Sequence, residues 1–220
     1  MCDEGGRPRI DFLVGERVSS LDAMSRVYSN LKKRVDPFID GKEWDYTLPA
    51  SLKHIGAMVH VGRGLYAIRA WMKRRKDSIV HVHNQRLGMI LHLNDFSPSV
   101  VFCHDIIEYV MREYWAGSWY KAFIRLYVTG TMKADVILTP SMFTADDIRR
   151  NFPANTPRLE VIHNGVDSDL FRQTDRNVFL RRFGLPEDRK YMLYVGSEQP
   201  RRTFPQSFAR SSRLRRSSQT

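Results

Sequence analysis

Short apolar segments alternate with longer segments of helical periodicity along most of the chain. Residues 9–14 (RIDFLV) predict a strand, and apolar side chains recur at helical spacing over residues 21–35. Four more segments, rich in Val or Ile, predict buried strands at residues 78–83, 99–103, 135–139 and 159–162. Helix-sized segments lie between these strands at residues 65–76, 105–129 and 141–151. The alternation predicts an α/β fold, a Rossmann-like parallel sheet with helices on both faces.

The pattern changes after residue 165. The next segment predicts a linker that contains one short helix over residues 175–183 and then a break at Gly184, and residues 191–195 (YMLYV) predict the opening strand of a second domain. The last residues are mostly Ser and Arg, a composition that buries too little apolar surface to fold. We therefore expect a first domain over residues 9–165, a linker over 166–189, the first strand of a second domain over 190–202 and a disordered Arg/Ser tail over 203–220.

Polar and turn-forming residues mark two boundaries in this pattern. Ser141 opens a helix-sized segment, so we expect its side chain to cap the helix N-terminus, and Pro153 follows the end of the same segment. Asn164 and Gly165 both tolerate positive φ. We expect these two residues to form a tight turn where the first domain ends.

The positive charge of the chain is concentrated near its end. Six arginines fall between residues 201 and 216, where no acidic residue occurs, and without them the formal charge falls from +11 to +5. The tail therefore suggests one alternative function, the binding of nucleic acid or of an anionic surface. The rest of the chain is only mildly basic.

Cysteine content and hydropathy predict a cytoplasmic protein. Two cysteines, Cys2 and Cys103, cannot build a disulfide framework, because the first lies at the terminus and the second inside an apolar segment. The N-terminal residues lack the apolar stretch of a signal peptide, and no segment approaches the roughly 18 apolar residues of a membrane span. We expect a cytoplasmic location and leave open a peripheral association with the inner membrane surface.

His104 is the leading candidate for a functional side chain. It follows an apolar strand segment and precedes Asp105, at the place where open α/β sheets bind ligands. An imidazole there can donate or accept a hydrogen bond or a proton. The alternatives are a hydrogen-bonded structural histidine and, for Asp105, a helix cap.

Two other groups imitate cofactor sites. His81 and His83 share one face of their strand, but no third ligand with suitable spacing follows, so we expect no metal. Asn84, which ends that strand, is a candidate for acceptor binding or a turn residue. The stretch from Gly62 imitates a dinucleotide-binding loop, but Asp77 comes too early to be its ribose acid, and we expect no cofactor.

Five motifs in order resemble glycosyltransferase family 4. They are HVHN at residues 81–84, CHD at 103–105, ADVILTPS at 134–141, VIHNGVD at 161–167 and YVGSEQPRR at 194–202. The resemblance implies the two-domain GT-B architecture, in which the first domain receives the acceptor and the second holds a nucleotide sugar. It also implies transfer with retention and without a metal, because helix N-termini and basic side chains stabilise the departing diphosphate.

The resemblance implies roles for individual residues. His104 corresponds to a family histidine that faces the cleft between the domains and contacts the donor sugar. We take Asn84, Asp105 and Ser19 as candidate substrate-binding residues. Arg201 and Arg202 lie where the family places an arginine and a lysine on the donor diphosphate.

Departures from the family pattern affect the expected activity. Arg202 replaces a lysine, Ser197 replaces a basic residue, and residues 15–20 (GERVSS) lack paired glycines, although Ser19 can supply a hydroxyl. The paired glutamates of the second domain have no positions in this sequence. We expect a hexosyltransferase by descent that uses a nucleotide-sugar donor and a glycan or lipid-linked acceptor, truncated before most of the donor site. The alternative is a noncatalytic acceptor-binding or interaction module that works with a separately encoded C-terminal domain.

Overall fold

The computed structural model describes residues 2–16, 23–46, 62, 65–66, 68–70, 72–73, 75–93, 96–111, 117–169 and 171–191. The chain divides into two units, Met1–Gly165 and Val166–Thr220.

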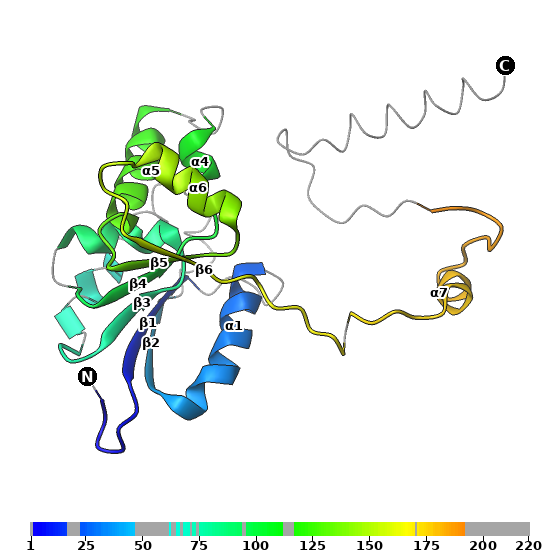
Figure 1. Ribbon diagram of the computed structural model, residues 1–220, viewed down its shortest axis with the longest axis horizontal. Coiled ribbons are helices and arrows are strands. Elements are labelled where there is room, and N and C mark those ends of the chain that lie inside the picture. The colour runs from blue at the N-terminus through cyan, green and yellow to red at the C-terminus, as the bar shows by residue number, and fades with distance from the viewer. Residues whose placement is uncertain are drawn as a thin grey trace. The chain divides into compact units, whose positions relative to one another are not determined.

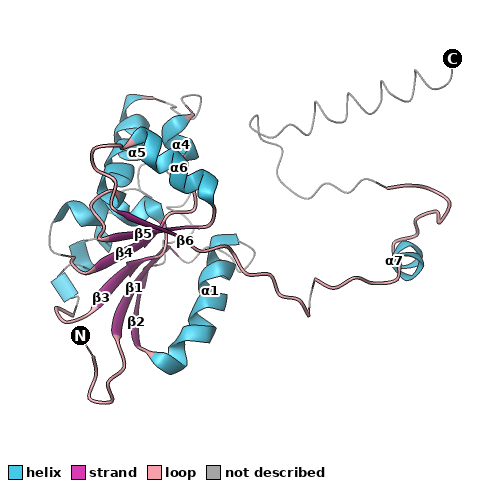
Figure 2. Cartoon of the chain, in the orientation of Figure 1, coloured by secondary structure: helices cyan, strands magenta, loops and turns pink. Residues whose placement is uncertain are grey.

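A parallel β-sheet forms the centre of the first unit (Figures 1 and 2). Its six described strands are β1 (Arg9–Glu16), β2 (Asp40–Tyr46), β3 (Ile79–Val82), β4 (Ser99–Phe102), β5 (Val136–Thr139) and β6 (Arg158–Val161). They run in the order β2-β1-β3-β4-β5-β6, and every neighbouring pair is parallel. The order reverses between β1 and β3, and such a switch point leaves a crevice outside the carboxyl ends of the strands.

Helices connect these strands. The described helices of the first unit are α1 (Ala23–Val35), η1 (Asp36–Phe38), η2 (Gln85–Leu93), α4 (Ile107–Val110), α5 (Ser118–Thr131) and α6 (Met142–Asn151), with η1 and η2 being 3-10 helices. The second unit contains α7 (Arg176–Arg182). No described helix is long and apolar enough to cross a membrane.

Alternate residues of β1 divide the core between the two faces of the sheet. Phe12 packs with Tyr28 of α1 and with Ile39. Its neighbour Leu13 points the other way, into a larger cluster that includes Val82 of β3 and Ile124 of α5. Helices therefore cover both faces, and the predicted α/β fold with a Rossmann-like parallel sheet is confirmed.

Most predicted elements of the first unit are present within one or two residues, and β2 is the strand that the pattern missed. Its sequence, DGKEWDY, is polar. It lies at the edge of the sheet and is stabilised by charged side chains: Lys42 lies 4.3 Å from the centroid of the Trp44 ring, and Glu43 forms an ion pair with Lys32 of α1 at 3.2 Å. An edge strand held in this way lacks the apolar alternation by which strands are recognised.

The single helix predicted over residues 105–129 is wrong. Helix α4 ends at Val110, Met111 has an extended backbone, and α5 begins after Gly117. Gly117 has a φ of 89°, a conformation that only glycine adopts readily and that a helix cannot continue through. Among the described residues of the predicted helix 65–76, the helical ones extend to Lys73, and Lys76 lies in a turn.

Helix caps agree with the sequence, whereas one predicted turn does not. The Ser141 hydroxyl accepts a hydrogen bond from the Thr144 amide at 3.2 Å, which confirms the cap of α6. Gly184 follows α7 with a φ of 63° and ends that helix, as predicted. The tight turn expected at Asn164 and Gly165 is wrong, because residues 162–167 leave β6 without a turn and Gly165 is not among the glycines with positive φ. The strand predicted over residues 191–195 lies outside the described residues, apart from Tyr191.

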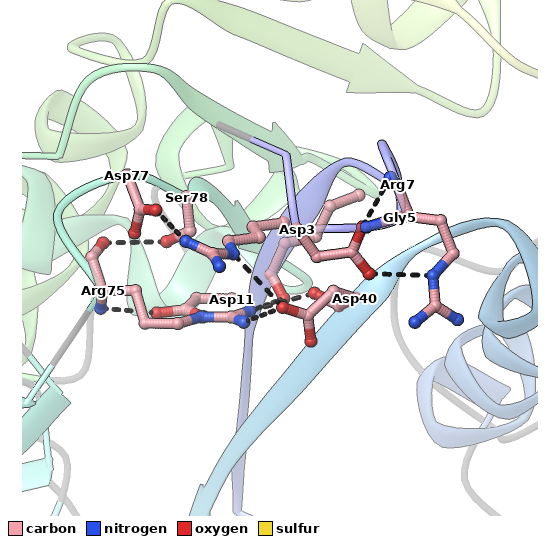
Figure 3. A network of polar contacts seen from close by, with 10 residues as sticks. Asp3, Gly5, Arg7, Asp11, Asp40, Arg75, Asp77 and Ser78 are labelled. Atoms are coloured by element: carbon pink, nitrogen blue, oxygen red, sulfur yellow. Dashed lines mark hydrogen bonds and ion pairs between the residues drawn. The ribbon is translucent and has the colours of Figure 1, made fainter.

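A buried carboxylate anchors the edge of the sheet at which β1 and β2 begin (Figure 3). Asp11 of β1 is 1% exposed, and its two oxygens accept hydrogen bonds from the Arg75 amide at 3.0 Å and from Arg75 Nε at 2.8 Å. The same guanidinium donates to the Asp40 carboxylate at 2.6 Å and to the Asp40 carbonyl at 3.0 Å. Arg75 therefore joins the starts of β1 and β2 to the segment that leads into β3.

Two glycines allow η2 to pack closely on α5. A Cβ added to Gly88 would lie 2.6 Å from the carbonyl oxygen of Tyr127, and one added to Gly130 would lie 2.2 Å from the carbonyl oxygen of Gly88. Backbone therefore meets backbone at this contact. The Thr131 hydroxyl adds a hydrogen bond to the Gln85 carbonyl at 3.2 Å, which fixes the first residue of η2.

Candidate functional site

The carboxyl ends of β3 and β4 bring the HVHN and CHD motifs to the same edge of the sheet. Backbone pairing continues one residue past β3 and β4, because the His83 amide donates to the Leu13 carbonyl at 3.1 Å and the Cys103 amide donates to the Leu138 carbonyl at 2.8 Å. The residues that follow, Asn84 and His104, therefore leave the sheet at the same edge. This edge is the one that open α/β sheets use for ligands.

Histidine and aromatic rings form a row along one sheet face toward this edge. The His81 ring lies 5.2 Å from Phe12, and the His83 ring lies 4.9 Å from Tyr28 of α1, measured between centroids. At the end of the row, the His104 ring is 5.8 Å from His83, edge-on. It is also 4.6 Å from Phe102. We call these six residues the aromatic row.

The main chain of His104 is held on both sides. Its amide donates to the side-chain oxygen of Gln85 at 3.2 Å, and its carbonyl accepts from the Thr144 hydroxyl of α6 at 3.4 Å. The Gln85 Nε2 group donates to the Asp105 carbonyl at 3.0 Å. Sequence reasoning missed Gln85, although its place directly after HVHN is a signal that could have indicated it.

Asn84 and Asp105 both act locally on the backbone. The Asn84 Oδ1 atom accepts from the Arg86 amide at 2.9 Å, where η2 begins. The Asp105 Oδ1 atom accepts from the Ile107 amide at 3.1 Å, at the first residue of α4. The turn alternative is therefore realised at Asn84, whereas the N-cap residue of α4 is Ile106 and Asp105 lies one residue before it. The roles of Asn84 and Asp105 toward a substrate stay predictions.

Burial keeps His81 neutral. Desolvation, followed by the charge of neighbouring His83, lowers the pKa of His81 from 6.5 to about 3. His81 thus stands uncharged among aromatic side chains. No group of three or more His, Cys, Asp or Glu side chains within the described ranges could hold a metal ion.

This pKa predicts a loss of stability in mild acid. Between pH 6.5 and 3 the unfolded chain protonates His81 and the folded chain does not. The folded state therefore has its full stability with respect to His81 above pH 6.5, and the free energy of unfolding falls as the pH decreases below that value. From pH 7.5 to pH 5 the free energy of unfolding should decrease by about 2 kcal/mol from this residue. Urea unfolding at both pH values measures it. His81→Gln should remove this decrease and His92→Gln should retain it; an equal decrease in His81→Gln and wild type would contradict the assignment.

The remaining alternatives from the sequence fall at structural positions or outside the described residues. Burial raises the pKa of the Cys103 thiol far above its usual range, which leaves it unreactive. In the dinucleotide-like stretch, Gly62 and Tyr66 are helical and Tyr66 is buried in the core. Ser19, Arg201 and Arg202 lie outside the described residues, and so does the arginine tail.

Comparisons with known proteins agree with the motifs. The family model described as Glycosyltransferase Family 4 matches residues 45–170, more than half of the chain. A D-inositol 3-phosphate glycosyltransferase of Nocardioides sp. (strain ATCC BAA-499 / JS614) is 37% identical over 67 residues, which are 30% of this chain and 15% of that protein. The D-inositol 3-phosphate glycosyltransferase of Mycolicibacterium smegmatis is 34% identical over 68 residues, 31% of this chain and 16% of that protein.

Among solved structures, Medicago truncatula UGT71G1 complexed with UDP-glucose superposes with a TM-score of 0.49 at 9% identity, covering 81% of this chain and 57% of that chain. The sequence matches to the two inositol phosphate glycosyltransferases named above span about a sixth of the length of those proteins. The family model, by contrast, covers strands β3 to β6 and every motif from HVHN to VIHNGVD. The chain belongs to glycosyltransferase family 4.

Proposed function

We propose that the chain forms the acceptor-side domain of a retaining hexosyltransferase that uses a nucleotide-sugar donor. The observation that carries the proposal is the position of His104, whose main chain is held by Gln85 and Thr144 at the carboxyl edge of the sheet. The family membership of residues 45–170 supports it. We propose a glycan or lipid-linked acceptor and a cytoplasmic location, with residues 166–189 acting as the linker to a donor domain.

The chemistry that we propose needs few groups from this domain. The acceptor hydroxyl forms a bond to the anomeric carbon of the sugar, the bond from that carbon to the diphosphate breaks, and the hydroxyl proton leaves with the diphosphate. His104 would hydrogen-bond the transferred sugar, since an imidazole can donate or accept. Asn84 and Asp105 would lie beside the acceptor. Arg201 and Arg202 would neutralise the diphosphate charge without a metal.

A transfer assay tests this function. The full chain, purified with any polypeptide that accompanies it, is given radiolabelled UDP-glucose, UDP-N-acetylglucosamine or GDP-mannose, with D-inositol 3-phosphate or a polyprenyl phosphate lipid as acceptor. We expect transfer from at least one donor with retained anomeric configuration. Transfer only in the presence of a second polypeptide would favour the noncatalytic acceptor-binding module. Absence of transfer in every combination would contradict the proposal.

A further inference from the structure

We propose that Gln85 is a positioning residue that sets the place and orientation of the His104 imidazole; the inference rests on the function proposed for His104. Its side chain bonds to the loop between β4 and α4 and touches no reacting atom in this scheme.

The Gln85 carboxamide forms a two-point contact with this loop. Its oxygen accepts from the His104 amide at 3.2 Å, and its nitrogen donates to the Asp105 carbonyl at 3.0 Å. The residue is 5% exposed, so water does not replace these bonds easily. A carboxamide offers a donor and an acceptor side by side without depending on pH.

The backbone of Gln85 is itself held in place. Its carbonyl accepts from the Thr131 hydroxyl of α5, and three residues later Gly88 lies against Gly130 of α5. Arg86, the residue after Gln85, forms an ion pair with Glu108 of α4. The other carboxylate oxygen of Glu108 accepts from the Tyr127 hydroxyl at 2.5 Å. The carboxamide therefore projects from a tightly packed element, as a group that fixes a functional side chain must.

Gln85 and Thr144 hold different backbone groups of His104. The Thr144 hydroxyl holds the carbonyl of His104 at 3.4 Å and Phe102 packs on its ring, whereas Gln85 accepts from its amide. Without the carboxamide, the His104 amide loses this acceptor, and the Asp105 carbonyl keeps the weaker contact from the Cys103 thiol at 3.5 Å. Small displacements of a group that contacts substrate are costly for catalysis.

Substitution by glutamate gives a reversible test. In Gln85→Glu, a protonated carboxyl can accept from the His104 amide and donate to the Asp105 carbonyl, as the carboxamide does, whereas the ionised carboxylate can only accept and faces a carbonyl oxygen. Burial should raise the pKa of this introduced carboxyl above its ordinary value. Gln85→Met removes both bonds at similar size. Thr131→Val is the matched control, because it removes a hydrogen bond from the Gln85 backbone and leaves the carboxamide intact.

NMR of the full chain reads the result at His104. We measure the protection factor of the His104 amide and the imidazole shifts across pH. In Gln85→Met the protection factor should fall by at least about 10-fold at every pH. In Gln85→Glu it should be close to wild type at low pH and fall as the carboxyl ionises. In Thr131→Val the protection factor of the His104 amide should vary with pH in the same way as in wild type.

The inference and the proposed function can fail separately. Unchanged protection and imidazole shifts in Gln85→Met would overturn the positioning role, whatever the chain transfers. If the loop loosens in Gln85→Glu with increasing pH while sugar transfer keeps its wild-type pH profile, the positioning role is also overturned. If His104→Ala leaves transfer unchanged, the proposed function of His104 fails, and the NMR result on the loop still stands by itself.

Discussion

Replacing Arg75 with methionine is expected to lower the free energy of unfolding by about 3–5 kcal/mol. The reason is the carboxylate of Asp11, which is 1% exposed and accepts from both the amide and Nε of Arg75. Without the guanidinium a charge stays buried with one backbone partner. Guanidinium chloride unfolding at pH 7.5 measures the change.

Two companion variants separate a buried charge from lost packing. Asp11→Asn combined with Arg75→Met should recover part of the stability, because no unpaired charge is left in the sheet. Arg149→Met breaks an ion pair with Asp146 in which both side chains are about half exposed, and should cost less than about 1 kcal/mol. A cost for Arg75→Met as small as that for Arg149→Met would contradict the anchoring role.

Gly130→Ala is expected to lower the free energy of unfolding by about 3 kcal/mol or more. The added methyl group would lie 2.2 Å from the Gly88 carbonyl oxygen and 2.9 Å from the Met89 Cα, and both are backbone atoms that cannot rotate away. Helix η2 must therefore move off α5. Denaturant unfolding and the His104 amide shift report the two consequences, a less stable chain and a displaced Gln85.

Gly165→Ala is the control for this substitution. A Cβ at Gly165 meets no atom within 4 Å, and the residue does not have a positive φ. We expect a change within about 0.5 kcal/mol. Equal stabilities of Gly130→Ala and Gly165→Ala would show that the two backbones do not meet as closely as described.

The fold could be predicted from the sequence where local pattern and burial coincide. Strands such as β3 and β5 are short apolar segments paired on both sides, so their composition reports their environment. The cap of α6 is equally local, since Ser141 bonds an amide three residues on. Edge strand β2 could not be found this way, because distant charges such as Arg75 and Lys32 stabilise it.

The position of the candidate site could be predicted from the sequence, but the contacts that hold its residues in place could not. His104 could be placed at a strand end from the sequence because strand ends of a parallel sheet gather at one edge. The contacts of Gln85 could not, because its partners lie 19 and 20 residues further along the chain and depend on how η2 packs; its place after HVHN marks the position without its partners. The break at Gly117 was hidden for a related reason: apolar periodicity continues on both sides of it.

The most direct test is the rate of sugar transfer by His104→Ala. It is measured with the donor and acceptor between which the wild-type chain transfers sugar in the assay proposed above. His92→Ala is the control, because that imidazole bonds the Leu126 carbonyl of α5 at 2.9 Å and is not part of the aromatic row. We predict that kcat/KM falls by at least about 100-fold in His104→Ala and stays within about twofold of wild type in His92→Ala. Equal rates for His104→Ala and wild type would contradict the claim that this edge of the sheet is the sugar-transfer site.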